Sequence, residues 1–355
     1  MIEPTTIARN VAQIPDYEEG KPPRPLFDVD YMSELEAMWG RKWGAQTDLG
    51  KLRMVLVSKP VVGELTPEHI EEMKRAPALY GLVRGIPDLK KQQEQHANFV
   101  TILRSHGVEV VDLNLPPEPR GIYVPVVRGV RGTRDIVVIN GGAIIPRNAI
   151  ATKRGCEPYW AQRVIELGCP ILYTVHGSGC FEGGNVCWLD SKHVMIGVGL
   201  RGNLEGIRQV EFVMRNAGVE DVHVVYLAGY LNKALGYQHH LDCVFNMVDE
   251  GLAVCYVPGI DYLSLDHLIR KGIKLIEVPP EEMRNAACNC LAIEPGKVIM
   301  VAGNPYTHEA LVKEGCEVIE VDWSEYTKQG GGASGGGGPI CATAPLIRDP
   351  GPMLK

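Results

Sequence analysis

Long apolar runs and an excess of positive charge are both missing from this chain of 355 residues. No run of 18 apolar residues occurs, so the sequence predicts no membrane-spanning helix. The first twenty residues carry acidic side chains and no apolar core, unlike a secretory signal peptide. The net charge of −7 argues against a nucleic-acid surface and against a polybasic membrane anchor. We therefore expect a cytoplasmic protein whose partners include neither nucleic acid nor membrane.

Closely paired cysteines are missing as well. None of the ten cysteines forms a CxxC pair, and Cys288 and Cys290, which form CNC, lie far from the histidines in sequence. Structural zinc sites usually need such spacings, so the sequence gives a metal site little support. Ten cysteines spread along a long chain favour free thiols over a disulfide framework.

The composition that is present is globular, with 45% hydrophobic and 22% charged residues, and the chain is long enough for a large core. Five segments share one pattern, in which an amphipathic, helix-like stretch ends at a glycine and a short apolar run follows. A glycine just past a helix is the expected left-handed terminator, and the run after it suits a buried strand. The five glycines are Gly107, Gly168, Gly218, Gly272 and Gly315.

Strand candidates precede each of these helices. Only KLRMVLVSKP is clear in the first copy, whereas residues 134–147, 183–199, 242–257 and 290–303 each hold two apolar runs around turn residues. The unit is therefore strand, strand, helix, strand, and its recurrence favours a repeat fold over an α/β chain whose elements alternate by chance. Five units would close into a ring without exposed sheet edges. We expect one domain over residues 51–355, with residues 1–50 as a partly helical appendage.

Chemically active residues fall at the same place in successive units, after the closing strand. These are Asp135 in TRD, Glu182 in FEGGN, His240 and Asp242 in HHLDCVF, and Cys341 after a glycine-rich run, while ACNC holds the place after the fourth unit. In a ring of repeats, equivalent positions surround one axis, so these side chains are expected to converge at one end of a central channel. If His240 and Asp242 lie on a strand, both point to one face.

Three motifs carry a family resemblance. FEGGN, HLDCVF and GGGGPIC followed by PLIRD resemble the signatures of the arginine deiminase and amidinotransferase superfamily. The resemblance covers nearly the whole chain past residue 50. It implies the pentein fold, a five-bladed α/β propeller of strand–strand–helix–strand units around a pseudo-fivefold axis, which agrees with the five repeats.

The resemblance also implies roles for the motif residues. Cys341 matches the nucleophile and His240 the general acid and base, while Glu182 matches the acid that hydrogen-bonds near the histidine. Asp135 and Asp242 match the carboxylates that clasp a guanidinium group. Two carboxylates can hold this planar cation in line for attack, and a thiolate is the strongest side-chain nucleophile. No metal or organic cofactor is required.

Substrate contacts are less fixed by the motifs. Arg201 stands where similar sequences have an arginine that can meet a substrate carboxylate, and Arg147 and Asn203 are further candidates. Asn185 is a fourth candidate and stands where many relatives have aspartate. Other departures from the family pattern are Ile136, Gly202 and Ala342. They favour a guanidino substrate that need not be arginine itself.

Three functions remain open. The first is hydrolysis of a C–N bond in arginine or an arginine derivative through a covalent adduct on Cys341, releasing ammonia or an amine. The second is an amidinotransferase that passes the amidino group from the same adduct to an amine. The third is a non-catalytic binding protein on the same fold, which the retained set of polar residues disfavours. A homodimer or higher homo-oligomer is a reasonable expectation for an enzyme of this size.

The run GGGASGGGG over Gly330–Gly338 would suit a spacer, yet few residues follow it. We interpret it as a loop that returns across the channel mouth and opens and shuts over the substrate. Pro339 would stiffen its end just before Cys341. The following ATAPLIRD would then add a strand to the first unit and close the circle.

Overall fold

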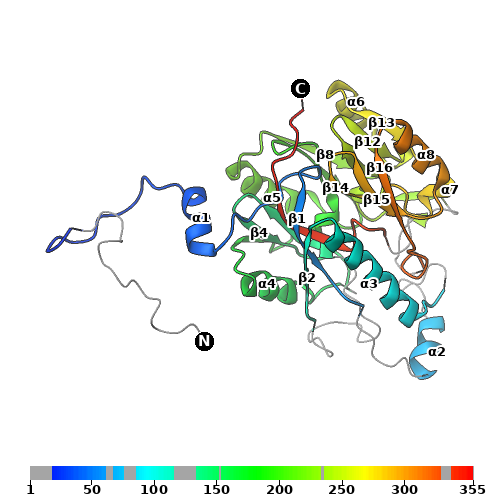
Figure 1. Cartoon of the computed structure of the whole chain (residues 1–355), viewed down its shortest axis with the longest axis horizontal. Coiled ribbons are helices and arrows are strands. Elements are labelled where there is room, and N and C mark those ends of the chain that lie inside the picture. The colour runs from blue at the N-terminus through cyan, green and yellow to red at the C-terminus, as the bar shows by residue number, and fades with distance from the viewer. Residues whose placement is uncertain are drawn as a thin grey trace.

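The structure is a computed structural model and describes residues 18–60, 67–75, 85–115, 133–151, 153–232, 236–328 and 337–354. These residues form an α/β fold with five three-stranded sheets and one two-stranded sheet (Figure 1). None of their helices is both long enough and apolar enough to cross a membrane.

The five three-stranded sheets share one arrangement, in which a first strand pairs antiparallel with a middle strand and the middle strand pairs parallel with a third. In the order first, middle and third, the strands are β17 (Thr343–Arg348), β1 (Leu52–Val57) and β2 (Glu109–Asp112); β3 (Val137–Ile139), β4 (Gly142–Ile145) and β5 (Ile171–Thr174); β6 (Val186–Trp188), β7 (His193–Val198) and β8 (Asp221–Tyr226); β11 (Phe245–Asp249), β12 (Leu252–Cys255) and β13 (Lys274–Glu277); and β14 (Leu291–Glu294), β15 (Lys297–Val301) and β16 (Glu317–Val321).

One helix connects the middle and third strands of each sheet, because a parallel pair needs a crossover. These helices are α3 (Leu89–Ser105), α4 (Glu157–Glu166), α5 (Leu204–Asn216), α6 (Tyr262–Arg270) and α8 (Pro305–Lys313). The five glycines that follow them have φ between +72° and +93°, as the sequence predicted. Five copies of the strand–strand–helix–strand unit are therefore present, and their closure around a fivefold axis stays a prediction.

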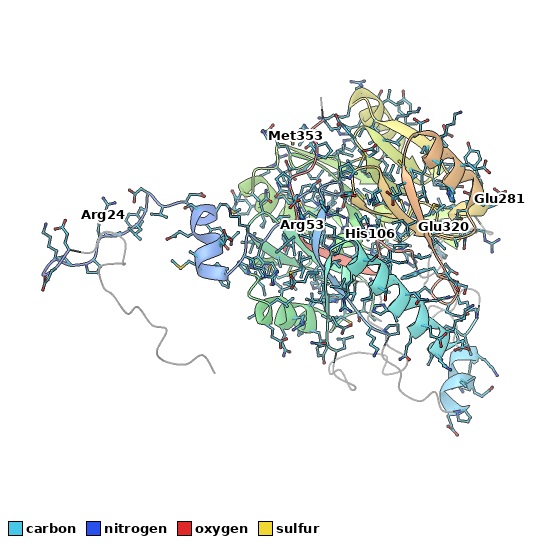
Figure 2. The ribbon with its side chains drawn as sticks, viewed as in Figure 1. Arg24, Arg53, His106, Glu281, Glu320 and Met353 are labelled. Carbon is cyan, nitrogen blue, oxygen red and sulfur yellow. The ribbon has the colours of Figure 1, made fainter. Side chains whose placement is uncertain are left out.

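The last strand of the chain belongs to the first unit. β17 pairs antiparallel with β1, placing Leu56 opposite Ala344 and Val57 opposite Thr343, and the two strands lie side by side in Figure 1. This confirms the predicted strand in ATAPLIRD. Outside the sheet, exposed Arg53 donates to Asp349 just past β17; Figure 2 labels this arginine.

The remaining elements lie between or before these units. They are α1 (Tyr31–Trp39), α2 (Pro67–Arg75), α7 (Pro280–Met283), β9 (Tyr230–Asn232) and β10 (Gly236–Tyr237). α1 begins at Asp30, whose side chain accepts hydrogen bonds from the backbone of Met32 and Ser33. It buries Leu35 while Phe27 before it is 95% exposed, and residues 43–50 are buried throughout. The division of the chain at residue 50 stays a prediction.

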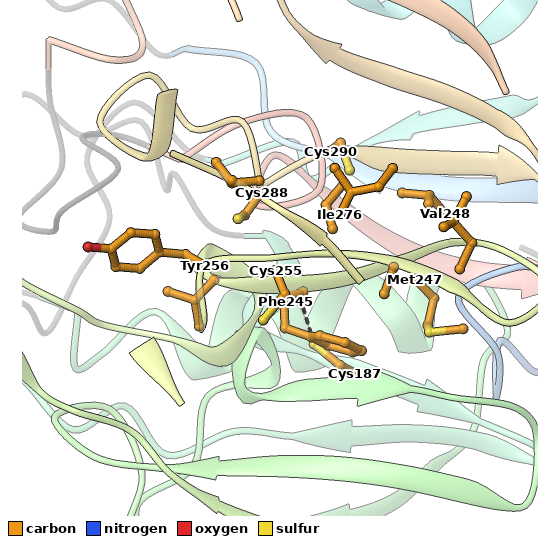
Figure 3. Packing of buried hydrophobic residues seen from close by; sticks show 14 of the residues in the cluster. Cys187, Phe245, Met247, Val248, Cys255, Tyr256, Ile276, Cys288 and Cys290 are labelled. Carbon is orange, nitrogen blue, oxygen red and sulfur yellow. Dashed lines mark hydrogen bonds between the residues drawn. The ribbon is translucent and has the colours of Figure 1, made fainter. Parts of the chain in front are cut away.

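Cysteines fill part of the core rather than forming bridges, and all ten are free. Figure 3 shows one apolar cluster, in which Cys288 and Cys290 of the CNC segment pack near Cys255 and Phe245. The Cys187 thiol donates a hydrogen bond to the carbonyl of Phe245, at 3.4 Å. The predicted absence of a disulfide framework is confirmed, and burial of these thiols is a packing role.

Candidate active site

Three one-turn 3-10 helices bring the predicted polar residues together. They are η3 (Thr133–Asp135), η4 (Gly183–Asn185) and η5 (Leu241–Cys243), which end just before β3, β6 and β11. η3 contacts η4, and η4 contacts η5. Asp135, Glu182 and His240 each place one ligand-type atom within 4.8 Å of the others, and so do His240, Asp242 and Cys243. The convergence expected from the repeat positions is present.

Glu182 and His240 form the centre of the site. Nε2 of His240 lies 2.9 Å from Oε2 of Glu182, and both side chains are buried. Burial alone would raise the pKa of Glu182, but Lys153, Arg201 and His240 together hold it well below its usual value. Glu182 is therefore a carboxylate that can orient the imidazole ring and stabilise its protonated form.

Lys153 is the first residue of the site that the sequence did not indicate. Its Nζ lies 2.9 and 2.7 Å from the two carboxylate oxygens of Asp135 and 2.8 Å from Oε2 of Glu182. Burial favours the neutral amine, yet the two carboxylates raise the pKa of Lys153 above its usual value. Burial also raises the pKa of Asp135, against the opposing effect of Lys153. No periodicity or motif marks this lysine in ATKRG.

Arg201 adds a second cation on the far side of Glu182. Its Nη1 lies 3.4 Å from both carboxylate oxygens of Glu182, and its Nη2 lies 3.3 Å from Nδ1 of His239. Burial, followed by the positive charge of Arg201, lowers the pKa of His239 to about 3, so this ring is neutral and accepts the hydrogen bond. The structure thus pairs the buried Arg201 with Glu182.

Cys341 approaches the same centre from the end of the glycine-rich run. Its Sγ lies 3.6 and 3.7 Å from the two carboxylate oxygens of Asp242. Interaction with Cys243, burial and the Asp242 charge raise the pKa of Cys341 well above its usual value. Burial and Cys243 also raise the pKa of Asp242, while Arg134 lowers it. In the free protein, Cys341 is therefore a neutral thiol.

Asn289 is the second residue that the sequence left unnamed. Its Oδ1 accepts hydrogen bonds from the backbone N–H groups of Gly338 and Cys341, at 2.5 and 3.3 Å. Its Nδ2 donates to the carbonyl of Asp242, at 2.9 Å. Asn289 lies in ACNC, at the position equivalent to the other site residues, so the repeat was the signal that could have found it. It fixes Cys341 relative to Asp242.

Glycine at position 184 lets the histidine approach. A Cβ atom there would lie 2.7 Å from Nδ1 of His240 and 3.2 Å from an oxygen of Asp242. His240 and Asp242 do not share a strand, because His240 caps η5 in an extended conformation and Asp242 lies within that turn. The conditional prediction of strand alternation is therefore wrong. Both residues still reach the site, since the 3-10 turn brings them around Gly184.

The other predicted substrate contacts have structural partners or none. The Arg147 side chain donates to the carbonyl of Gly179. Asn203 caps α5 by accepting from the Gly206 N–H, and its amide donates to Ser178. Asn185 is fully buried, and its side-chain atoms have no hydrogen-bond partner among the described residues. These positions supply no open polar group that we carry into the proposed substrate contacts.

Metal-like spacing occurs at the two groupings around His240. In the first, the Lys153 ammonium already supplies the positive charge between Asp135 and Glu182. In the second, Asp242 faces the thiols of Cys243 and Cys341. We assign the spacing to an organic cation site and a nucleophile, and we identify no residue as a metal ligand.

Sequence comparison places the chain in a family. A family model described as arginine deiminase matches residues 158–261 and 263–348, more than half of the chain. The 2-nitroimidazole nitrohydrolase of Mycobacterium sp. (strain JS330) is 27% identical, with 97% of this chain and 93% of that protein covered. The N(G),N(G)-dimethylarginine dimethylaminohydrolase of Pseudomonas aeruginosa is 29% identical, with 70% and 89% covered.

Solved structures show the shared fold. A dimethylarginine dimethylaminohydrolase from Pseudomonas aeruginosa, a cysteine-to-serine mutant complexed with citrulline, has a TM-score of 0.60 at 23% identity over 83% of this chain and 99% of that chain. An amidinotransferase from Microseira wollei has a TM-score of 0.66 at 16% identity, with 89% and 99% covered. The chain therefore belongs to the arginine deiminase family, a family of hydrolases within the superfamily that also contains amidinotransferases.

Proposed function

We propose that this chain is a cysteine-dependent hydrolase that cleaves a C–N bond of a guanidino compound. The observation that carries the proposal is the position of the Cys341 thiol, 3.6 Å from Asp242 and in the same cluster as the His240–Glu182 pair. Nucleophile, acid–base group and orienting carboxylate are the three parts that covalent catalysis needs. The matched relatives act on dimethylarginine, arginine and 2-nitroimidazole by their names.

Binding would place the guanidino group between the Cys341 thiol and His240. Asp242 is positioned to hold the group beside Sγ, and Asp135 approaches it from the Glu182 side of the site. A positive charge next to Asp242 would favour the thiolate, because it offsets the negative charge that now opposes ionisation.

Reaction would then proceed in two halves. The Cys341 sulfur attacks the guanidino carbon, and His240 donates its proton to the departing nitrogen, which leaves as ammonia or an amine. Glu182 stabilises the protonated ring before this transfer. In the second half, His240 takes a proton from water, the water oxygen bonds to the same carbon, and the C–S bond breaks. The products are an amine and a urea-type compound, and the thiol is restored.

An amidinotransferase remains the alternative, since a solved amidinotransferase shares the fold. The two differ only in whether water or an amine reaches the adduct. A non-catalytic binding role has less support, because Cys341, His240 and Glu182 are retained together at one point.

The experiment is a panel of guanidino compounds, read out for ammonia, amine and urea-type products with and without glycine as acceptor. Product released without acceptor supports hydrolysis, whereas release only with glycine supports transfer. Mass spectrometry of acid-quenched reactions should find the amidino adduct on Cys341, and Cys341→Ala should lose both adduct and turnover. Turnover retained by Cys341→Ala would refute the proposal.

The five units are proposed to close into a ring, with the site at its centre. Neighbouring first strands support this: β17 contacts β3, β6 contacts β11, and β11 contacts β14. Each first strand also follows a site residue or, for β14, follows Asn289. A solved structure would test the pseudo-fivefold axis directly.

A further inference from the structure

The carboxylates at the centre of the site are already paired with cations of the chain itself. Lys153 bonds both oxygens of Asp135 and one oxygen of Glu182, and its side chain is only 25% exposed. Arg201 bonds Glu182 from another direction. Two negative and two positive side chains therefore balance before any substrate enters.

Lys153 is anchored where it lies. Its backbone N–H donates to Ile150, and its carbonyl accepts from the Asn148 side chain, at 3.1 Å each. Glu157 receives the N–H groups of Asn148 and Gly155, at 2.9 and 2.7 Å. These bonds fix the described residues on both sides of the lysine, so its ammonium is a permanent part of the site.

The same segment is tied to the site by its backbone. The N–H of Ala149 donates to Oε1 of Glu182, at 3.1 Å. Moving the segment away would break this bond as well as the three bonds of the Lys153 ammonium. A substrate cation would gain Asp135 only by separating that buried pair, which is costly for the charge left alone.

The nucleophile side of the site is also uncharged in the free protein. The Cys341 thiol faces Asp242, and burial beside Cys243 favours the protonated form of both groups. A fully protonated guanidinium would therefore bring an unbalanced charge into a buried site that holds two fixed cations. Like charges a few ångströms apart repel strongly at low dielectric.

Building on the proposed function, we propose that Lys153 sets the substrate class: the site takes a weakly basic guanidino group that enters without its extra proton. Such groups carry an electron-withdrawing substituent on nitrogen. Alkylguanidinium ions, which stay protonated at neutral pH, are disfavoured. Lys153 is a specificity-determining residue, because it acts through the charge of Asp135 and Glu182.

The protons balance without another reactant. The imino nitrogen of the entering guanidine takes the proton of the Cys341 thiol, which yields a thiolate and a guanidinium ion in place. The sulfur then bonds to the guanidino carbon, and the C–N bond to the substituted nitrogen breaks as His240 protonates it. The net charge of the site is unchanged on entry, and the electron-withdrawing substituent makes the departing nitrogen a better leaving group.

Two alkylating agents of nearly equal shape test the charge preference without knowledge of the substrate. 2-Chloroacetamidine is a cation and 2-chloroacetamide is neutral, and both alkylate thiols. The measured quantity is the ratio of their rates at Cys341, read by peptide mass spectrometry with partly exposed Cys180 as internal reference. A ratio cancels changes in the thiolate fraction that affect both agents alike.

Lys153→Met removes the charge and keeps the length of the side chain. We expect it to raise the cation-to-neutral ratio at Cys341 by about tenfold or more, whereas Lys153→Arg keeps the wild-type ratio. Exposed Lys192→Met is the matched control, since Lys192 pairs with Glu220 away from the site. A Lys153→Met ratio within about twofold of the wild type would overturn the proposal. Thermal unfolding of each variant confirms that it is folded.

Substrate turnover gives a second readout. Canavanine and arginine differ by one oxygen in place of a methylene group, and the oxyguanidino group of canavanine is much the weaker base. The wild type should have the higher kcat/KM for canavanine, and Lys153→Met should shift the ratio toward arginine. A wild type that prefers arginine contradicts the charge preference while leaving the hydrolase proposal intact. If no guanidino compound reacts, the hydrolase proposal fails, and the alkylation ratio still decides the role of Lys153.

Discussion

Nε2 of His240 lies 2.9 Å from Oε2 of Glu182, and this bond joins the turns before β6 and β11. The carboxylate is buried and held ionised by the surrounding cations. Glu182→Gln would keep the shape and remove the charge that stabilises a protonated His240. We expect kcat to fall about a hundredfold or more, because proton transfer to the leaving nitrogen loses its support.

Steady-state kinetics on any substrate found in the guanidino panel measure this effect. Glu220→Gln is the control, since Glu220 is an exposed partner of Lys192. An unchanged kcat in Glu182→Gln would remove Glu182 from the proposed machinery.

Gly184→Ala tests how closely the imidazole must approach. The new Cβ would lie 2.7 Å from Nδ1 and 2.8 Å from Cγ of His240, so the ring has to shift. We expect kcat to fall about tenfold or more through this misplacement. Gly199→Ala is a matched control, because its Cβ would meet only the side chain of Leu227, at 3.3 Å. Equal activity of the two variants would show that the ring tolerates displacement.

Much of the fold was readable from the sequence because its signals are local. A glycine that ends a helix needs a left-handed backbone, and Gly107 and Gly315 show it at +77° and +93°. Hairpin turns and β-branched runs are similarly local. Repetition of these signals then located the unit, and the unit located Asp135 and Glu182 at equivalent positions.

The missing parts of the site depend on contacts distant in sequence. Lys153 reaches Asp135 and Glu182 from a polar segment without periodicity, so nothing local marks it. The pairing of Arg201 with Glu182, rather than with a substrate group, likewise follows from packing. Asn289 was detectable only as the occupant of a repeat position. Residues 330–336 of the glycine-rich run lie outside the described residues, so the predicted closing motion is untested.

Asp242→Asn is expected to make Cys341 more reactive toward a neutral alkylating agent while abolishing turnover. The Asp242 carboxylate contributes to the raised pKa of the Cys341 thiol, after Cys243 and burial. A raised thiol pKa means less thiolate at neutral pH, and removing the carboxylate lowers that pKa and increases the thiolate fraction. Iodoacetamide rates at Cys341 between about pH 7 and pH 9 measure this.

In the wild type, the same rate should still be rising at about pH 9, because the folded thiol ionises above its ordinary range. Asp242→Asn should shift the rising limb to lower pH. Superimposable profiles would show that Asp242 carries no charge near Cys341. Asp249→Asn on the edge of β11 serves as a control of equal chemistry.

The Arg134–Asp48 pair should be essential for stability because it is buried beside the site. Nη2 of Arg134 lies 2.9 Å from Oδ1 of Asp48, and Oδ2 of Asp48 accepts from the Trp188 N–H, at 2.7 Å. Both residues are less than a tenth exposed. Asp48→Asn leaves the guanidinium buried without its counter-charge, which typically costs about 3–5 kcal/mol of the free energy of unfolding.

Urea unfolding of Asp48→Asn, Arg134→Met and the double variant measures this coupling. The double variant should lose less than the sum of the single losses, because no lone charge remains buried. Asp349→Asn, which breaks the exposed pair with Arg53, should cost much less. Additive losses would mean that Arg134 and Asp48 stabilise the fold independently. Since Arg134 precedes Asp135 in η3, Arg134→Met should also lower kcat by displacing that carboxylate.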